Sequence, residues 1–117
     1  MSDESSTRER GRKGEDRAAA YLIRHGLEII ERNVTIAGAE IDLVTRDRET
    51  IVFVEVRGRA DDRLGHPLET VDARKRTRLR RGATGWLIRH DLWERVAVRF
   101  DVVALVGDDI EWLPNAF

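Results

Sequence analysis

Two short segments of alternating residues constrain the fold of this chain most. Residues 40–46 (EIDLVTR) and 51–57 (IVFVEVR) each repeat with the period of two that is typical of β-strands. The four residues between them, 47–50 (DRET), are all polar, so the two segments are predicted to form an antiparallel hairpin. The second segment holds Glu55 and Arg57 among residues that favour a buried strand, and these two charges need a physical explanation.

Alternation divides the side chains of this hairpin between two faces. One predicted face is wholly apolar: Ile41, Leu43, Val52, Val54 and Val56. The opposite face is mixed: Glu40, Asp42, Val44, Ile51, Phe53, Glu55 and Arg57. On the mixed face the apolar residues lie near the turn and the charged residues lie at the far end. The hairpin therefore gathers its charged side chains at one end of the predicted sheet.

The rest of the chain supplies a helical pattern on each side of these strands. Residues 13–25 and 70–90 have apolar residues at helical spacing, and residues 27–36 and 96–106 are predicted strands. A short strand is expected at residues 110–113. A long helix before the strand at 96–106 allows a right-handed crossover, which would make that strand parallel to the third. The prediction is an α/β fold with an αβββαβ core, in which helices flank a mixed β-sheet.

Length and composition exclude several classes of protein. A chain of 117 residues suits one domain, predicted over residues 11–117, and the polar residues 1–10 are predicted to form a disordered tail. Charged residues make up 37% of the chain, yet the net charge is only −1, so total charge does not indicate a nucleic acid or a membrane. The absence of cysteine excludes disulfides and thiolate metal sites. With no apolar run of about 18 residues and no apolar leader, we expect a cytoplasmic protein without a membrane partner.

A symmetric turn would place Asp42 directly across the hairpin from Glu55, and Glu40 across from Arg57. Directly opposed side chains lie about 4.5–5.5 Å apart, where like charges destabilise a sheet. Two carboxylates this close either share a proton or hold a cation, and their oxygens suit Mg²⁺ or Mn²⁺. The alternative is a solvated end of the sheet, where Glu40 and Asp42 form ordinary ion pairs with arginines.

A third carboxylate belongs to the first predicted helix. Glu15 lies on the same helical stripe as Ala18, Ala19 and Leu22, which is the stripe expected to face the sheet. It is therefore a candidate to join Asp42 and Glu55. The alternative is an acidic residue of the first turn, favoured there by the helix dipole.

The second predicted helix is rich in basic residues near its start. Arg74, Arg78 and Arg81 share one face, a pattern that suits phosphate backbones, although a solvated helix face is the alternative. Lys75 instead falls within the apolar stripe and should point toward the sheet, unless its stem only covers the edge of the core. The predicted nucleic-acid contacts are Arg57, Arg59, Arg74, Lys75, Arg78 and Arg81.

Six segments of the chain also carry a family resemblance. They are GRKGEDRAAAYL (11–22), AGAEIDLVTRD (37–47), VFVEVRGR (52–59), LGHPLETVDARKRTRL (64–79), RFDVVAL (99–105) and NAF (115–117). In this order they resemble the YraN-like family of uncharacterised bacterial proteins. That family is similar to the restriction-endonuclease-like superfamily, with its PD-(D/E)xK pattern, and among its members to archaeal Holliday junction resolvases.

The resemblance implies a restriction-endonuclease-like domain and a Mg²⁺- or Mn²⁺-dependent endonuclease that hydrolyses DNA, perhaps branched or damaged DNA. It implies Glu15, Asp42 and Glu55 as catalytic, metal-binding carboxylates. Arg57 then occupies the place of the superfamily's lysine, and Lys75, where the YraN-like pattern also has a lysine, is a possible substitute. Resolvase-like nucleases act as dimers, so the resemblance also implies a homodimer.

The sequence departs from the pattern at two positions. Ala39 replaces a glycine that usually precedes the Glu-Ile-Asp of the second strand, a change that leaves the carboxylates in place. Arg57 keeps the positive charge of a lysine but stays protonated at any working pH, so it cannot act as a base toward water. Two alternatives therefore remain open: a non-catalytic nucleic-acid-binding module on the nuclease fold, and an adaptor that binds another protein.

Overall fold

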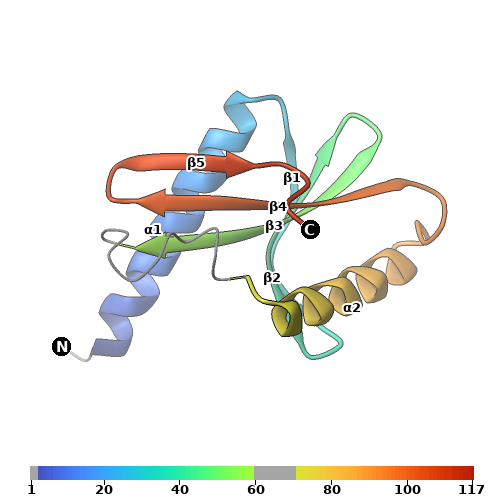
Figure 1. Ribbon diagram of the computed structural model, residues 1–117, viewed down its shortest axis with the longest axis horizontal. Helices are drawn as coiled ribbons and strands as arrows, with labels where there is room; N and C mark the ends of the chain where they lie inside the picture. The colour runs from blue at the N-terminus through green and yellow to red at the C-terminus, as the bar shows by residue number, and fades with distance from the viewer. Residues whose placement is uncertain (1–2, 60–70) are drawn as a thin grey trace.

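A five-stranded sheet lies between two helices in the computed structural model, which describes residues 3–59 and 71–117 (Figure 1). The strands follow one another across the sheet in the order β1-β2-β3-β4-β5. The elements are α1 (Asp3–Arg24), β1 (Glu28–Ile36), β2 (Ala39–Asp47), β3 (Thr50–Arg59), α2 (Ala73–Arg89), β4 (Ala97–Val106) and β5 (Asp109–Leu113). The predicted α/β architecture is confirmed.

The strand directions agree with the crossover predicted from the sequence. Strands β1, β2 and β3 form an antiparallel meander, β4 runs parallel to β3, and β5 returns antiparallel to β4. The helix α2 makes the connection between the two parallel strands, as a parallel pair requires. Within the described residues, neither helix is long and apolar enough to cross a membrane.

The first helix is longer than its apolar pattern predicts. Its helical backbone begins at Asp3, whereas residues 1–10 were predicted to be a disordered tail and the helix was expected only from Lys13. Residues 1–10 contain no proline or glycine, and their glutamates and arginines favour a helix. Once the apolar stripe fixes the later turns, adding further turns needs no buried face.

Each face of the sheet carries its own apolar cluster. The α1-facing cluster is built on Ala18, Ala19, Leu22, Leu27, Leu43, Val52, Val54, Val103 and Leu105. The α2-facing cluster is built on Val34, Ile36, Ile41, Val44, Ile51, Phe53, Val71, Leu79, Ala83, Trp86, Leu87 and Val102. The central strands of the sheet are therefore buried on both faces, and in β3 the residues from Ile51 to Glu55 are all buried.

Strand β2 breaks the predicted alternation at Asp42. Leu43 belongs to the α1-facing cluster as predicted, but Ile41, two residues away, belongs to the α2-facing cluster. On the neighbouring strand β1, Asn33 has a left-handed φ of 54° at the same level. A left-handed residue within a strand changes the local direction of the backbone, as a β-bulge does. The prediction that Ile41 shares a face with Leu43 was therefore wrong.

The β2–β3 register is the symmetric one expected from the turn. Pairing runs from Asp47 opposite Thr50 to Leu43 opposite Val54, and the ladder ends there. Asp42 thus lies at a fork where β2 leaves β3, one step beyond the last pair. The predicted pairing of Glu40 with Arg57 falls outside the observed ladder.

Close packing sets the position of α2 on the sheet. A Cβ atom added to Gly82 would lie 2.8 Å from the Cβ of Ala39, a distance that ordinary Cβ atoms do not reach. Only glycine therefore lets the helix approach the start of β2 this closely. The methyl group of Ala39 is accommodated because Gly82 has no side chain.

Candidate functional site

The fork between β2 and β3 places the carboxylate of Asp42 between two strands. One oxygen of Asp42 accepts a hydrogen bond from the backbone N–H of Val56, with Oδ2 and N 2.8 Å apart. In a continuous ladder a β2 carbonyl would accept this bond. The side chain therefore replaces a backbone acceptor, which fixes the carboxylate beside β3.

Glu55 points from β3 toward α2 and is only 5% exposed. Its Oε1 lies 2.7 Å from Nζ of Lys75 and 3.5 Å from Nη1 of Arg57. The shorter contact belongs to the lysine, so Lys75 is the main counter-ion of this buried carboxylate. The cation closest to Glu55 thus comes from α2 and not from β3 itself.

The start of α2 explains why Lys75 reaches Glu55. Asp72 caps the helix, and its Oδ1 accepts a hydrogen bond from the backbone N–H of Lys75 at 2.9 Å. The cap fixes the first turn, and Lys75 there lies one turn before the buried Leu79 on the sheet-facing side. The alkyl stem follows the edge of the core while the ammonium group binds Glu55, so the expected snorkelling and the ion pair occur together.

Burial and neighbouring negative charge raise the pKa of Asp42 from 3.8 to about 8. Loss of hydration is the largest cause, and the charge of Glu55 is the next. The hydrogen bond from Val56 acts in the opposite direction, while the charge of Glu15 and a hydrogen bond with Glu55 add to the increase. Asp42 and Glu55 therefore form the close carboxylate pair predicted from the hairpin.

Glu15 approaches the pair from the α1 side of the sheet. It is half-buried, and its negative charge reaches Asp42 strongly enough to affect the pKa of that residue. Among the described side chains, those of residues 11–58 and 71–117, however, no three acidic or histidine groups lie closely enough to hold one metal ion together. The donors of Asp42 and Glu55 fit a hard divalent cation, and Glu15 stands outside that immediate pair.

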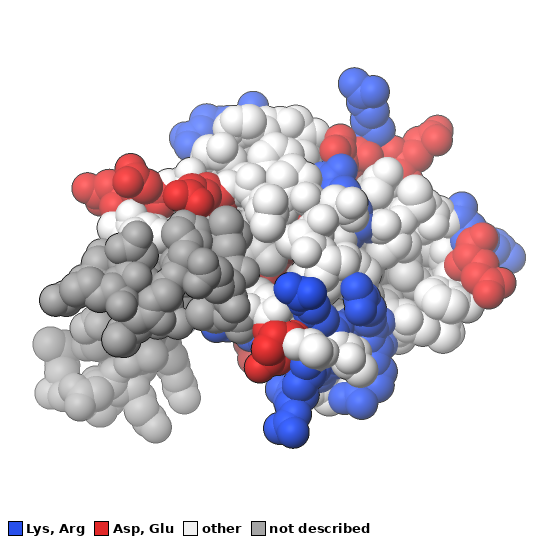
Figure 2. Space-filling model, viewed as in Figure 1, with Lys and Arg blue, Asp and Glu red and all other residues white. Residues whose placement is uncertain are grey.

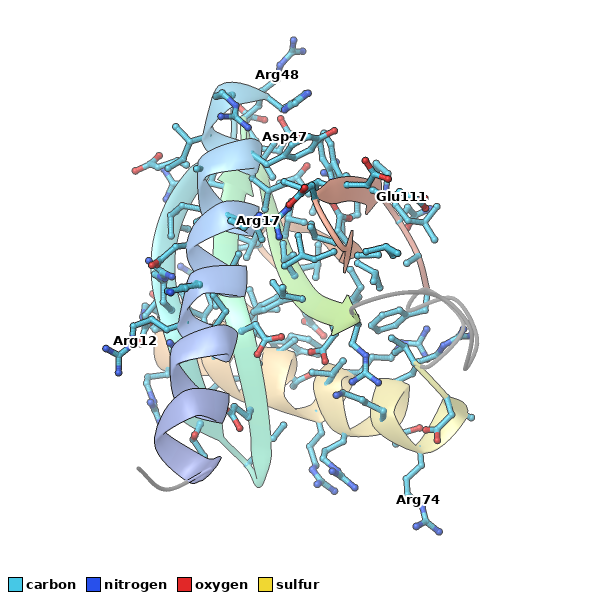
Figure 3. All side chains as sticks on the ribbon, turned by 90° about the vertical axis from the view of Figure 1, so that its left-hand side faces the viewer. Arg12, Arg17, Asp47, Arg48, Arg74 and Glu111 are labelled. Carbon is cyan, nitrogen blue, oxygen red and sulfur yellow. The ribbon has the colours of Figure 1, made fainter. Side chains whose placement is uncertain are left out.

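Basic side chains surround the first half of α2. Figure 2 shows Lys and Arg gathered over this helix, and in Figure 3 Arg74 points away from it. Arg78 is also exposed, while Arg81 donates from Nε to the carbonyl oxygen of Ala37 at 3.0 Å. The predicted stripe of Arg74, Arg78 and Arg81 therefore faces outward, and the side chain of Arg59 lies outside the described residues.

Two further arginines of α2 escaped the sequence prediction. Arg76 and Arg80 each place the guanidinium carbon 5.6 Å from the ring centroid of Phe117. A sequence pattern gives little sign of this contact, because it joins α2 to a residue 37 or more positions later in the chain. The nearest signal was the NAF segment at 115–117, which was part of the family resemblance.

Comparison with known proteins gives the chain clear relatives. The model of the Uncharacterised protein family UPF0102 matches residues 14–105. A UPF0102 protein of Halorhodospira halophila is 46% identical over 110 residues, which cover 94% of this chain and 88% of the relative. A UPF0102 protein of Pseudomonas paraeruginosa is 41% identical over an alignment that covers 100% of this chain and 98% of the relative.

Proposed function

This chain belongs to the uncharacterised protein family UPF0102, and we propose that it is a cytoplasmic, metal-dependent endonuclease that hydrolyses DNA phosphodiesters. The observation that carries the proposal is the Asp42–Glu55 pair, two neighbouring carboxyl groups in which burial and the charge of Glu55 oppose the negative charge of Asp42. A divalent cation would remove that conflict. The resemblance to restriction-endonuclease-like nucleases supports the same reaction, with branched or damaged DNA as the preferred substrate.

Asp42 and Glu55 would hold Mg²⁺ or Mn²⁺, and Glu15 would approach from the opposite face of the sheet. The bound cation would polarise the phosphate and lower the pKa of water. The protein's own contribution is to fix two carboxylates at the end of β3, one by the N–H of Val56 and the other by Lys75. Asp42 is held by a backbone N–H, and Glu55 is held by a lysine in the capped first turn of α2. The two carboxylates would therefore need little movement before the reaction.

Lys75 and Arg57 would have different tasks. Arg57 stays protonated and can neutralise negative charge that develops on the phosphate. Lys75 would orient Glu55 through the 2.7 Å contact between its Nζ and Oε1 of that carboxylate. The exposed arginines of α2 would bind the phosphate backbone without reading bases, because such contacts carry no direct sequence information.

A cleavage assay tests the proposal. Purified protein is incubated with linear and branched DNA in Mg²⁺, in Mn²⁺ and in EDTA, and cleavage is expected only with the metals. Asp42→Asn and Glu55→Gln should each lower the rate of cleavage by about 100-fold or more. Each substitution replaces a carboxylate ligand by an amide that has nearly the same shape but no charge. Cleavage that survives both substitutions would overturn the site.

A matched control uses an acidic residue at the other end of the hairpin. Glu49 is exposed in the β2–β3 turn, next to Arg48, which Figure 3 shows at the opposite end of the molecule from Arg74. Glu49→Gln removes the same charge as Glu55→Gln and should leave cleavage unchanged. A loss of activity in this control would indicate a general effect of net charge instead of a site.

A non-catalytic DNA-binding module is the second candidate. It is favoured by Arg57 in the lysine position and by a Glu15 that does not join the pair in a common site within the described residues. This candidate predicts salt-sensitive DNA binding without cleavage in either metal. Absence of DNA binding at low salt would favour a protein-binding adaptor, and sedimentation in the same buffers would test the proposed homodimer.

A further inference from the structure

The last residues of the chain fold back onto β4. The backbone N–H of Ala116 donates to the carbonyl oxygen of Phe100 at 2.7 Å, and that of Asn115 donates to Oδ1 of Asp101 at 2.9 Å. The ring of Phe117 stacks on Phe100, with centroids 5.1 Å apart and an interplanar angle of 26°. Two hydrogen bonds and one stacked ring therefore fix the position of Phe117.

The Phe117 ring in turn holds two cations. Arg76 and Arg80 lie one helical turn apart on α2, where like charges normally repel. Each guanidinium group lies over the ring, whose electron-rich face attracts both. Among the described side chains, those of residues 11–58 and 71–117, no carboxylate forms an ion pair with either arginine. We call Phe117, Arg76 and Arg80 the aromatic clasp.

The aromatic clasp lies beside the carboxylate pair. Phe117 and Glu55 line the same small cavity, of about 10 Å³, together with Leu79 and Phe100. A cavity of this size is at the lower limit for one water molecule, so the ring and the carboxylate are near neighbours in the core edge. Arg76 is further fixed because its Nε donates to the carbonyl oxygen of Val71 at 2.9 Å.

Helix geometry separates the aromatic clasp from the arginine stripe found in the sequence. At about 3.6 residues per turn, Arg76 and Arg80 project on one flank of the line through Lys75 and Leu79. The outward-facing stripe, Arg74, Arg78 and Arg81, projects on the other flank. Its Arg81 binds the β1–β2 turn, whereas the clasp binds the segment that follows β5.

We infer that the aromatic clasp binds the phosphate backbone of the nucleic-acid strand that reaches Asp42 and Glu55, and that Phe117 acts as a positioning residue for Arg76 and Arg80. This inference rests on the proposed function and names the contact that orients its substrate. A guanidinium group held against a ring loses less freedom when it binds a phosphate than a free one does. The ligand chemistry is a polyanionic nucleic-acid backbone, recognised without regard to base sequence.

Paired substitutions at position 117 test the role of the ring. Phe117→Leu keeps an apolar side chain on Phe100 but removes the aromatic face, whereas Phe117→Tyr retains that face. DNA affinity is measured in EDTA, so that no cleavage interferes, and is corrected for the folded fraction from circular dichroism. We expect Phe117→Leu to weaken binding about 3–10-fold with an unchanged salt slope, and Phe117→Tyr to restore it.

A second pair tests the charge. Arg80→Ala should weaken binding and lower the slope of log K against log salt by about one unit, since one phosphate contact is lost. Arg89→Ala is the matched control, because Arg89 is an exposed arginine in the last turn of the same helix. Equal affinities and slopes for these two variants, or equal affinities for the two Phe117 variants, would overturn the inference.

The outcomes also separate this inference from the proposed function. If the wild type binds DNA with the expected pattern yet cleaves nothing in Mg²⁺ or Mn²⁺, the nuclease proposal fails and the aromatic clasp stands. If the wild type cleaves DNA but the variants at 117 and 80 match their controls, only the clasp fails. A wild type that neither binds nor cleaves DNA contradicts both.

Discussion

Asp101 on β4 and Asp42 on β2 are both withdrawn from solvent, but their surroundings differ. Asp101 is fully buried and accepts four hydrogen bonds, two from the Arg99 guanidinium, one from the Trp112 indole and one from the backbone N–H of Asn115. Asp42 accepts one backbone hydrogen bond and lies beside Glu55, with the charge of Glu15 also within reach.

The difference shows two uses of a buried carboxyl group. Donors surround Asp101, so its negative charge is compensated inside the protein and it fastens the C-terminal segment to β4. Around Asp42 the hydrogen-bond donors do not balance the negative charge of the neighbouring carboxylates. A proton or an external cation bound there would balance it. The first arrangement stabilises a fold, and the second is typical of a functional site.

The largest expected effect is on the compensated carboxylate. Asp101→Asn would turn an amide N–H₂ toward groups that are themselves donors, and it would leave Arg99 with Asp47, at 3.2 Å, as its remaining carboxylate partner. Breaking a buried ion pair in this way costs about 3–5 kcal/mol of unfolding free energy. Urea unfolding at neutral pH measures it, and Asp108→Asn, exposed between β4 and β5, should change stability by less than about 0.5 kcal/mol. Similar stabilities for the two variants would break the comparison.

The pH dependence of Asp42 comes next. Its pKa is near 8 in the folded protein and near 3.8 when unfolded, so between those values the folded state holds a proton that the unfolded state releases. Stability should therefore fall as pH rises from about 4 to about 8. A tenfold change in proton affinity is worth about 1.4 kcal/mol, and partial exposure screens the charge, so we expect a loss on the order of a few kcal/mol.

Urea unfolding in EDTA across this pH range measures the effect. Asp42→Asn keeps an acceptor for Val56 but does not titrate, so the difference in stability between it and the wild type should grow with pH. Equal pH profiles for the two proteins would show that Asp42 is already compensated, as Asp101 is.

Lys75→Met has a smaller expected effect. It keeps most of the alkyl stem but removes the ammonium group from Glu55, which then retains Arg57 at 3.5 Å. Loss of one partner of a buried carboxylate should lower stability by about 1–3 kcal/mol. Thermal unfolding measures the change, with Arg74→Met, one position earlier and exposed, as the neutral control. An unchanged melting temperature would mean that Arg57 alone compensates Glu55.

Trp112→Phe should give the smallest change. It removes one of the four donors to Asp101 and keeps an aromatic ring against Tyr21, at a cost of about 1 kcal/mol. Trp93→Phe is the matched control, because Trp93 is 46% exposed and its indole N–H makes no hydrogen bond within the described part of the chain. A loss as large as that of Asp101→Asn would show that packing, and not the donor, accounts for the effect.

The sequence predicted those parts of the fold that follow from the alternation of side chains along a strand and from the right-handed connection between parallel strands. The alternation in residues 40–46 and 51–57 indicated the hairpin, its register and the closeness of Asp42 to Glu55. The helix before residues 96–106 indicated the parallel strand, since crossovers have one hand.

Other features depend on contacts that no pattern contains. Ile41 packs in the α2-facing cluster, at the level where Asn33 of the neighbouring strand is left-handed, and the alternation of residues 40–46 indicates neither feature. The closer contact of Lys75 than of Arg57 with Glu55 depends on how α2 packs on the sheet, which no sequence pattern contains. The aromatic clasp needed the C-terminal segment to fold back onto β4, where Asn115 donates to Asp101 and Phe117 stacks on Phe100.

The backbone amide of Val56, at the fork between β2 and β3, should give an NMR signal that is sensitive to the state of Asp42. Its proton is shared with the carboxylate of Asp42 instead of a backbone carbonyl. A hydrogen bond to a charged acceptor is shorter and stronger than one to a neutral acceptor. The resonance of this one amide in a ¹⁵N-correlated NMR spectrum should therefore move when Asp42 loses its proton and move again when a cation reaches the site. The chemical shift of the Val56 amide would thus report whether Asp42 is protonated or bound to a cation, without any need for a substrate.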